Sequence, residues 1–158
     1  MNPGSVRLQP DGSTLTETIL THSEEETAGL GRELAATLSA GDVLLLFGDL
    51  GAGKTAFVRG LAEGLGVSGD EVSSPTFTLI QEYRGGRLTL FHVDLYRIED
   101  PREFDELGLD EIAEGGVLAI EWAERLPRPP QNAVRVSITH AGESERRIAI
   151  EVSTKYEV

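Results

Sequence analysis

The chain has 158 residues, no cysteine, and a formal charge of −13 from 14 basic and 27 acidic side chains. This length predicts one domain, and the lack of cysteine excludes a disulfide-stapled secreted module and a cysteine-based zinc site. No apolar run approaches the ~20 residues that span a bilayer, and no signal region follows Met1, so we expect a soluble cytoplasmic protein without membrane contact. The negative charge opposes direct binding to nucleic acid, because lysine and arginine supply the affinity for phosphates.

The N-terminal third of the chain predicts a tail, a strand and a helix. Residues 1–12 contain proline, glycine and serine without periodicity and are expected to form a flexible tail, which leaves residues 13–158 as the single domain. Residues 14–20 have the composition of a strand. Ser23, with Glu26 three positions later, forms a capping box that predicts a helix to about residue 38.

The strongest motif lies between a predicted strand at 43–47 and a predicted helix at 55–65. Its pattern is G-x-x-x-x-G-K-[ST], and its residues are Gly48, Asp49, Leu50, Gly51, Ala52, Gly53, Lys54 and Thr55. Glycines let backbone amides surround phosphate oxygens, the lysine reaches the terminal phosphates, and the threonine offers a hydroxyl to Mg²⁺. A glycine-rich turn without a ligand is the alternative, but the strand and helix on either side are the context that the motif requires.

A loop and a hairpin follow the motif. Residues 78–83 and 88–94 flank a Gly-Gly pair, which predicts an antiparallel hairpin with a tight turn. Before the hairpin lie four residues that could respond to a γ-phosphate, although their spacing alone favours an ordinary turn. They are Ser74, Pro75, Thr76 and Phe77.

Two carboxylates, Asp94 and Glu121, end apolar runs that we predict to be strands. The carboxyl ends of strands open onto the nucleotide crevice in α/β sheets, so either side chain could organise Mg²⁺ or the attacking water. The alternative is that each caps a following helix. His92 is expected to be a structural residue with its hydrogen bonds satisfied, and the scattered histidines do not favour a zinc site.

The remaining segments complete the predicted fold. Residues 98–113 are expected to be helical, and eight acids against one arginine at 99–114 form either a solvated helix face or a docking surface for a basic partner. Strands are expected at 117–121, 134–139 and 147–152. Together these elements predict an α/β, P-loop NTPase-like three-layer fold. Its sheet is expected to be mixed and largely parallel, with an added antiparallel hairpin.

Four segments of the chain occur in the order and spacing of a known family. They are the motif at 48–55, the loop at 74–77, the segment His-Val-Asp-Leu-Tyr-Arg at 92–97 and the pair Glu121-Trp122. In these segments the chain resembles the bacterial TsaE ATPases of tRNA threonylcarbamoyladenosine biosynthesis. The resemblance implies a small ATPase that uses ATP and Mg²⁺ and joins the synthase subunits TsaB and TsaD. Its hydrolysis supports repeated threonylcarbamoyl transfer to the adenosine beside the anticodon. The tRNA is then contacted only through these partners.

The resemblance also implies residue roles. Lys54 holds the phosphates, Thr55 and Glu121 bind Mg²⁺, and Asp94 orients or deprotonates the hydrolytic water. The loop at 74–77 acts as a switch, and Glu24 and Thr27 lie near the adenine. Trp122, the only tryptophan, is then placed to report nucleotide occupancy.

Two departures and three alternatives remain at this point. Ala56 stands where the family usually has a second threonine, which puts the hydrolysis rate in doubt, and Ala123 stands where proline is usual. A small-molecule P-loop kinase needs several arginines in a lid over the phosphates. The acidic segment at 99–114, where such a lid could lie, contains only one arginine, which argues against a kinase. A GTPase needs an Asn-Lys-x-Asp element, which is absent. A nucleotide-binding scaffold without hydrolysis stays open.

Overall fold

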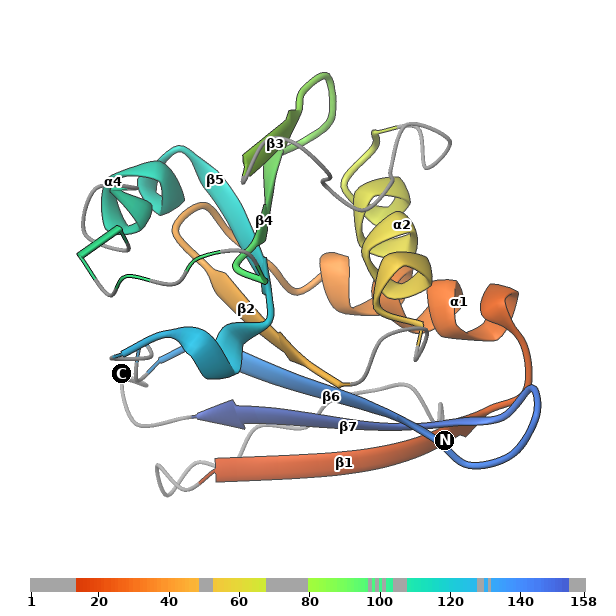
Figure 1. Ribbon diagram of the computed structural model, residues 1–158. Coiled ribbons are helices and arrows are strands. Elements are labelled where there is room, and N and C mark those ends of the chain that lie inside the picture. The colour runs from red at the N-terminus through yellow and green to blue at the C-terminus, as the bar shows by residue number, and fades with distance from the viewer. Residues whose placement is uncertain are drawn as a thin grey trace.

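Figure 1 shows the computed structural model, which describes residues 14–48, 53–67, 80–96, 98, 100, 102–103, 108–127, 130 and 132–153. The elements, in chain order, are β1 (Thr14–Thr21), α1 (Glu24–Ala35), β2 (Val43–Phe47), α2 (Lys54–Gly64), β3 (Ile80–Tyr83), β4 (Thr89–Asp94), α4 (Leu109–Glu114), β5 (Gly116–Glu121), η2 (Ala123–Arg125), β6 (Val134–His140) and β7 (Arg146–Ser153). The tail predicted at 1–12 lies outside the described residues. In the described part of the chain, no helix is long and apolar enough to cross a membrane.

The sheet is mixed, as the sequence predicts. Its seven strands run in the order β1-β7-β6-β2-β5-β4-β3. The middle pairs β6–β2, β2–β5 and β5–β4 are parallel, whereas β1–β7, β7–β6 and β4–β3 are antiparallel. Because β2, β5 and β4 are parallel neighbours, their carboxyl ends lie at one edge of the sheet, which is where α/β proteins bind ligands.

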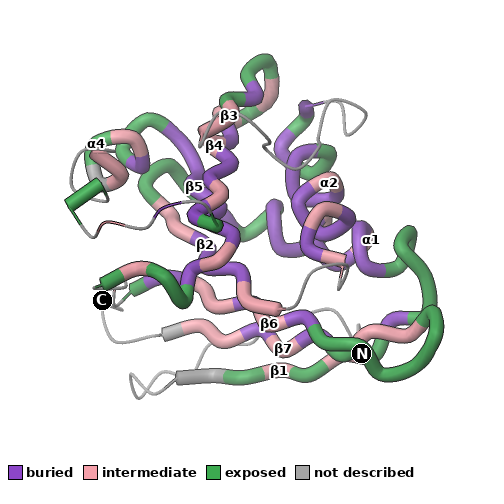
Figure 2. Tube along the Cα trace, in the orientation of Figure 1, coloured by how far each residue is buried: buried purple, intermediate pink, exposed green. Residues whose placement is uncertain are grey.

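Helices cover both faces of the central strands. Leu44 and Leu46 of β2 belong to the hydrophobic cluster under α1 and α2, and Leu45 belongs to a second cluster with residues of α4 and η2. Side chains alternate along a strand, so an uninterrupted apolar strand is covered on two sides. Figure 1 shows α1 and α2 on one side of β2 and α4 on the other, and Figure 2 shows the buried residues gathered in β4, β5 and α2. The predicted three-layer α/β fold is confirmed.

The start of α1 differs in one detail from the predicted capping box. The Ser23 hydroxyl accepts a hydrogen bond from the Glu26 backbone N–H at 3.1 Å, as expected for the N-cap. The Glu26 carboxylate, however, accepts from the backbone N–H of His22 at 2.8 Å and not from that of Ser23. The reciprocal bond is therefore shifted one residue toward β1, and it ties the end of that strand to the helix.

The prediction that residues 98–113 are helical is correct only in part: Arg102 and Glu103 are helical and α4 follows, but Ile98 and Gly108 are not helical. Helix α4 covers only Leu109–Glu114, and Gly108 before it has a φ of +62°, in the left-handed region that interrupts a right-handed helix. Ile98 is buried in the cluster on the α4 side but lies outside any helix. The apolar and acidic residues favour a helix along the segment, and Gly108 sets where it begins.

The predicted hairpin is confirmed, but its turn is longer than two residues. Strands β3 and β4 pair antiparallel with Tyr83 opposite Leu90. The connection docks against the end of α2, where the Arg87 backbone N–H donates to the Leu65 carbonyl oxygen at 2.6 Å. A Cβ on Gly86 would lie 2.2 Å from the same oxygen, so this close approach requires glycine. These contacts with the end of α2 hold the connection between β3 and β4 in a loop that is wider than the predicted two-residue turn.

Helices α1 and α2 cross at glycine residues. A Cβ on Gly60 would lie 1.8 Å from the Ala28 carbonyl oxygen, a backbone atom that can move only if the helices separate. We expect Gly60→Ala to lower the free energy of unfolding, measured in urea, by about 1–3 kcal/mol. The control is Gly29→Ala in α1, where a Cβ meets nothing within 4 Å. Gly29→Ala should raise the free energy of unfolding by about 0.5–1 kcal/mol. If it lowers this free energy as much as Gly60→Ala does, the close crossing of the two helices is contradicted.

Candidate active site

The junction of β2 and α2 positions Lys54. This residue begins α2, is 5% exposed, and donates from Nζ to the Gly48 carbonyl oxygen at 2.8 Å. The Nζ atom also lies 4.4 Å from the centre of the Trp122 ring, within cation–π range. The ammonium is therefore held between the end of β2 and the residue that follows β5.

Glycines bound the loop between β2 and α2. Gly53 has a φ of +107° and Gly48 a φ of +143°, and a Cβ on Gly48 would lie 2.3 Å from the Ile138 carbonyl oxygen of β6. Gly53 occupies the N-cap of α2 without a side-chain cap, so it leaves the first N–H groups of this 11-residue helix to other acceptors. Such a helix start favours an anion. The motif residues 49–52 lie outside the described residues.

Two carboxylates lie side by side at the ends of β4 and β5. Asp94 is directly opposite Glu121 in the parallel register. Glu121 is 3% exposed and accepts a hydrogen bond from His92 Nε2 at 2.5 Å. Asp94 is half-buried and accepts from the backbone N–H of Tyr96 at 2.9 Å. The structure therefore brings together the two carboxylates singled out in the sequence.

The environment of Asp94 favours its protonated form. Burial raises the pKa of its carboxyl above the usual value, and the negative charge of Glu121 acts in the same direction. The hydrogen bond from Tyr96 and the electrostatic influence of His92 and Lys54 lower the pKa and offset only part of this effect. The result is a carboxylate that takes up a proton more readily than an ordinary aspartate, which suits a general base.

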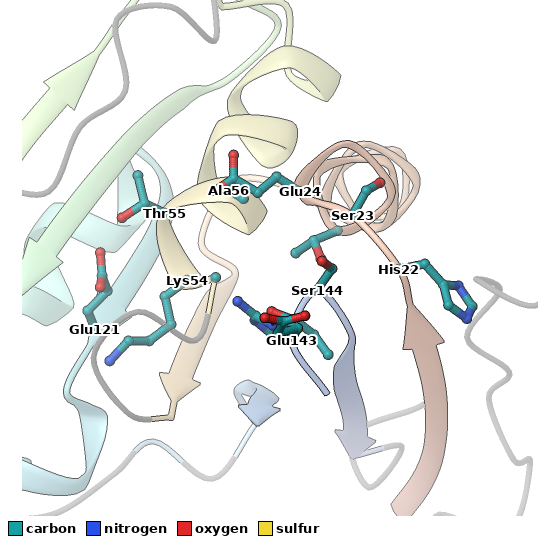
Figure 3. A pocket seen from close by; sticks show the side chains of 12 residues that line it. His22, Ser23, Glu24, Lys54, Thr55, Ala56, Glu121, Glu143 and Ser144 are labelled. Atoms are coloured by element: carbon teal, nitrogen blue, oxygen red, sulfur yellow. The ribbon is translucent and has the colours of Figure 1, made fainter. Parts of the chain in front are cut away.

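A cavity of about 620 Å³ opens beside these residues. Ligand pockets commonly have volumes in this range. The residues that line it are His22, Ser23, Glu24, Thr27, Gly53, Lys54, Thr55, Ala56, Glu121, Glu143, Ser144 and Arg146. Figure 3 shows Glu121, Thr55 and Lys54 on one side of the cavity and His22 and Ser23 on the other.

The structure places the predicted site residues differently with respect to this cavity. Those in the cavity wall are Glu24, Thr27, Gly53, Lys54, Thr55 and Glu121. Asp94 does not line the cavity but lies beside Glu121. The predicted switch-like loop at 74–77 lies outside the described residues, so its role stays a prediction.

The hairpin between β6 and β7 supplies part of the cavity wall, which no sequence pattern predicted. Arg146 donates from Nη1 to the carbonyl oxygens of Glu143 at 3.4 Å and Glu145 at 2.9 Å. Nε2 of His22 lies 3.4 Å from Oε2 of Glu145, which ties this hairpin to the start of α1. No local motif marks these residues. Their proximity follows from the strand order, which places β7 between β1 and β6.

Trp122 connects the buried lysine to the surface. Its φ of +61° is unusual for a residue with a large side chain. The ring centroid lies 4.9 Å from that of Tyr96, which is 47% exposed, and the Arg125 guanidinium lies 5.6 Å from the Tyr96 ring. The tryptophan is therefore in contact with the charge of Lys54 and suited to report changes there.

The oxygen atoms of Thr55 and Glu121 fit Mg²⁺ by their chemistry. Mg²⁺ prefers hydroxyl, carboxylate and phosphate oxygens, and proteins usually hold it by one or two carboxylates together with substrate phosphates and water. Among the described residues, there is no group of three His, Cys, Asp or Glu side chains that could hold a metal. Thr55 and Glu121 supply one hydroxyl and one carboxylate in the cavity wall.

Comparisons with known proteins show which family the chain resembles. The chain matches the family described as threonylcarbamoyl adenosine biosynthesis protein TsaE over residues 21–148, a span that contains every residue lining the cavity. It is 48% identical over 141 residues to the tRNA threonylcarbamoyladenosine biosynthesis protein TsaE of Bacillus subtilis, with 87% of each chain covered. The protein of the same name in Nostoc is 48% identical over 132 residues, with 80% of each chain covered. The crystal structure of Bacillus subtilis YdiB matches with a TM-score of 0.70 and 40% identity, covering 89% of this chain and 87% of that one.

Proposed function

The chain belongs to the TsaE family, which acts in tRNA threonylcarbamoyladenosine biosynthesis, and from that premise we propose that it binds ATP and Mg²⁺ in the cavity and hydrolyses ATP. One observation carries the proposal. Lys54, Thr55 and Glu121 line a single cavity, and Asp94 lies directly beside Glu121 at the carboxyl edge of the sheet. This arrangement combines an anion site, a metal-binding pair and a base.

The phosphates bind at the start of α2. Lys54 exchanges its hydrogen bond to the Gly48 carbonyl for bonds to phosphate oxygens, which are stronger because both partners are charged. The N–H groups of the first turn of α2 add the positive end of the helix dipole. The adenine is then directed to the wall that contains Glu24 and Thr27.

Thr55 and Glu121 are the proposed holders of Mg²⁺. When bound, the ion neutralises charge that develops on the phosphate oxygens during hydrolysis. The carboxylate of Glu121 is buried at the end of β5, where it lines the cavity together with Thr55.

Asp94 is the proposed acceptor of the proton from water. In hydrolysis the water oxygen forms a bond to the γ-phosphorus, the bond from that phosphorus to the β–γ bridging oxygen breaks, and the proton released by water passes to the Asp94 carboxylate. The raised pKa of Asp94 improves it as a base, and its bond from Tyr96 holds it in place.

We propose that this hydrolysis serves the synthase subunits TsaB and TsaD and supports repeated threonylcarbamoyl transfer to the adenosine beside the anticodon. The net charge of −13 supports an arrangement in which tRNA binds to the partners and not to this chain. The acidic residues at 99–114 favour steering by a basic partner surface, but several of them lie outside the described residues, so this docking surface stays a prediction.

Trp122 provides a direct test of nucleotide binding. We expect ATP with Mg²⁺ to change its fluorescence in a saturable titration, because the phosphates take the Lys54 ammonium from its place 4.4 Å from the ring. The Lys54→Ala variant should lose this response. An equal response in that variant would mean that the phosphates bind elsewhere and would contradict the proposed site.

A further inference from the structure

His92 is a buried polar residue that has no part in the proposed chemistry. It lies in the middle of β4 with 0% of its surface exposed, and it shares a sheet face with Leu90 and Asp94. It does not line the cavity. The prediction that its hydrogen bonds are satisfied is confirmed for one ring nitrogen and not for the other.

One ring nitrogen is bonded to Glu121. In the register of β4 and β5, His92 is opposite Ala119, and Glu121 lies two residues further along β5. The imidazole spans this diagonal, with 2.5 Å between Nε2 and Oε2 of Glu121. A carboxylate can only accept a hydrogen bond, so Nε2 of His92 carries the hydrogen and is the donor.

The second ring nitrogen, Nδ1, has no hydrogen-bond partner among the residues that the structure describes. A buried polar atom without a partner costs free energy, and a buried apolar side chain at this position avoids that cost. The hydrogen bonding of His92 is therefore directed to Glu121. It occupies Oε2 of the Glu121 carboxylate. Figure 3 shows the carboxyl group of Glu121 on the same side of the cavity as Thr55.

We propose that His92 is a positioning residue that holds the Glu121 carboxylate in the orientation needed to bind Mg²⁺. This inference rests on the proposed function, in which Glu121 and Thr55 hold the ion. The imidazole itself does not reach the cavity, so it influences the position of the ion through its bond to Glu121. Removing a group that orients a metal-binding side chain usually lowers metal affinity by about 10–100-fold.

The test is a Mg²⁺ titration of the protein saturated with a non-hydrolysable ATP analogue, followed by the fluorescence of Trp122. We expect His92→Leu to raise the Mg²⁺ midpoint by about 10–100-fold and to leave affinity for the analogue without Mg²⁺ unchanged. His92→Gln should restore most of the loss, because its amide can donate from near the position of Nε2. A midpoint in His92→Leu equal to that of the wild type would overturn the inference.

Phe91→Leu is the matched control. Phe91 is the neighbour of His92 on β4 but packs on the opposite face, against the cluster on the α4 side. We expect it to leave the Mg²⁺ midpoint unchanged, and a shift as large as that of His92→Leu would overturn the inference. If His92→Leu does not fold, His92→Gln is compared with His92→Asn, whose shorter amide does not reach the same position. Equal midpoints in these two variants would also overturn it.

The outcomes separate this inference from the proposed function. If the wild type shows no response to Mg²⁺, both fail. If the wild type responds and His92→Leu behaves identically, only the role of His92 fails.

Unfolding temperature gives a readout that does not depend on metal. The double variant His92→Leu with Glu121→Leu replaces both members of the buried pair by apolar residues, a change that is often neutral or stabilising. We expect its unfolding temperature to be at least that of the wild type while the Mg²⁺ response is lost. A lower unfolding temperature would assign the pair to folding and would contradict a positioning role.

Discussion

Asp94→Asn is expected to lower the rate of ATP hydrolysis by about 10²–10⁴-fold, the range that a positioned general base contributes. The amide cannot take a proton from water, but its oxygen can still accept the hydrogen bond from Tyr96, so the site keeps its shape. ATP affinity should be unchanged, because the phosphates are held at the start of α2. Phosphate release and equilibrium binding measure the two effects separately.

The control for this variant is Asp100→Asn, which removes the same charge at a position where the carboxylate pairs with Arg102. It should leave hydrolysis unchanged. If Asp94→Asn hydrolyses ATP at the wild-type rate, the chain has another base or none, and the assignment of Asp94 is wrong. If the variant loses ATP affinity together with hydrolysis, Asp94 belongs to the binding site.

The same substitution should stabilise the nucleotide-free protein at neutral pH. Burial raises the pKa of Asp94 above its usual value of 3.8, so the folded state binds this proton more tightly than the unfolded state. The protonated carboxyl of Asp94 therefore stabilises the fold relative to the ionised one. This contribution is fully present below pH 3.8 and is lost as the pH rises through the pKa of the folded state. Because asparagine carries no charge, Asp94→Asn should unfold at a higher temperature than the wild type at neutral pH. The difference should disappear in acid, where Asp94 is protonated. A lower unfolding temperature at neutral pH would contradict this.

Lys54→Ala is expected to weaken ATP binding by about 2–5 kcal/mol, the usual cost of truncating one partner of a hydrogen-bonded charge pair that is shielded from water. Lys54 is almost fully buried at the first position of α2, where the helix dipole and the ammonium act on the same phosphates. Isothermal titration with ATP measures the loss.

Arg59→Ala is the matched control for Lys54→Ala. Arg59 lies on the same helix, does not line the cavity, and approaches Glu25 only at 3.9 Å. Its removal takes away the same charge, yet ATP affinity should not change. Equal losses in both variants would show a general effect of net charge and would contradict a specific bond between Lys54 and phosphate.

The parts of the site with local signals could be predicted from the sequence. The apolar run of β2 is covered on both faces and therefore reads as a central strand. Gly48 and Gly53 after it have the positive φ values that the turn into α2 requires, and Lys54 begins that helix. Ser23 starts α1 through its own side chain. Asp94 and Glu121 could be found because each follows an apolar strand, and parallel neighbours place such residues together.

Other features depend on which strands are neighbours, and the sequence does not state this. The contact of the β6–β7 hairpin with the cavity follows from β7 lying between β1 and β6. The bond from His92 to Glu121 requires β4 and β5 to pair in one register, and the contact of Trp122 with Lys54 requires a left-handed residue after β5. A local pattern carries no information on such long-range pairings.

Formation of threonylcarbamoyladenosine over many turnovers tests the central claim most directly. Purified TsaB and TsaD, tRNA and threonylcarbamoyl-adenylate are combined with ATP, Mg²⁺ and either the wild-type chain or Asp94→Asn, and the modified nucleoside is counted by mass spectrometry. We predict several modified tRNA molecules per synthase with the wild type and no repeated turnover with Asp94→Asn. Equal yields from the two proteins would contradict the claim that ATP hydrolysis at this site drives the cycle.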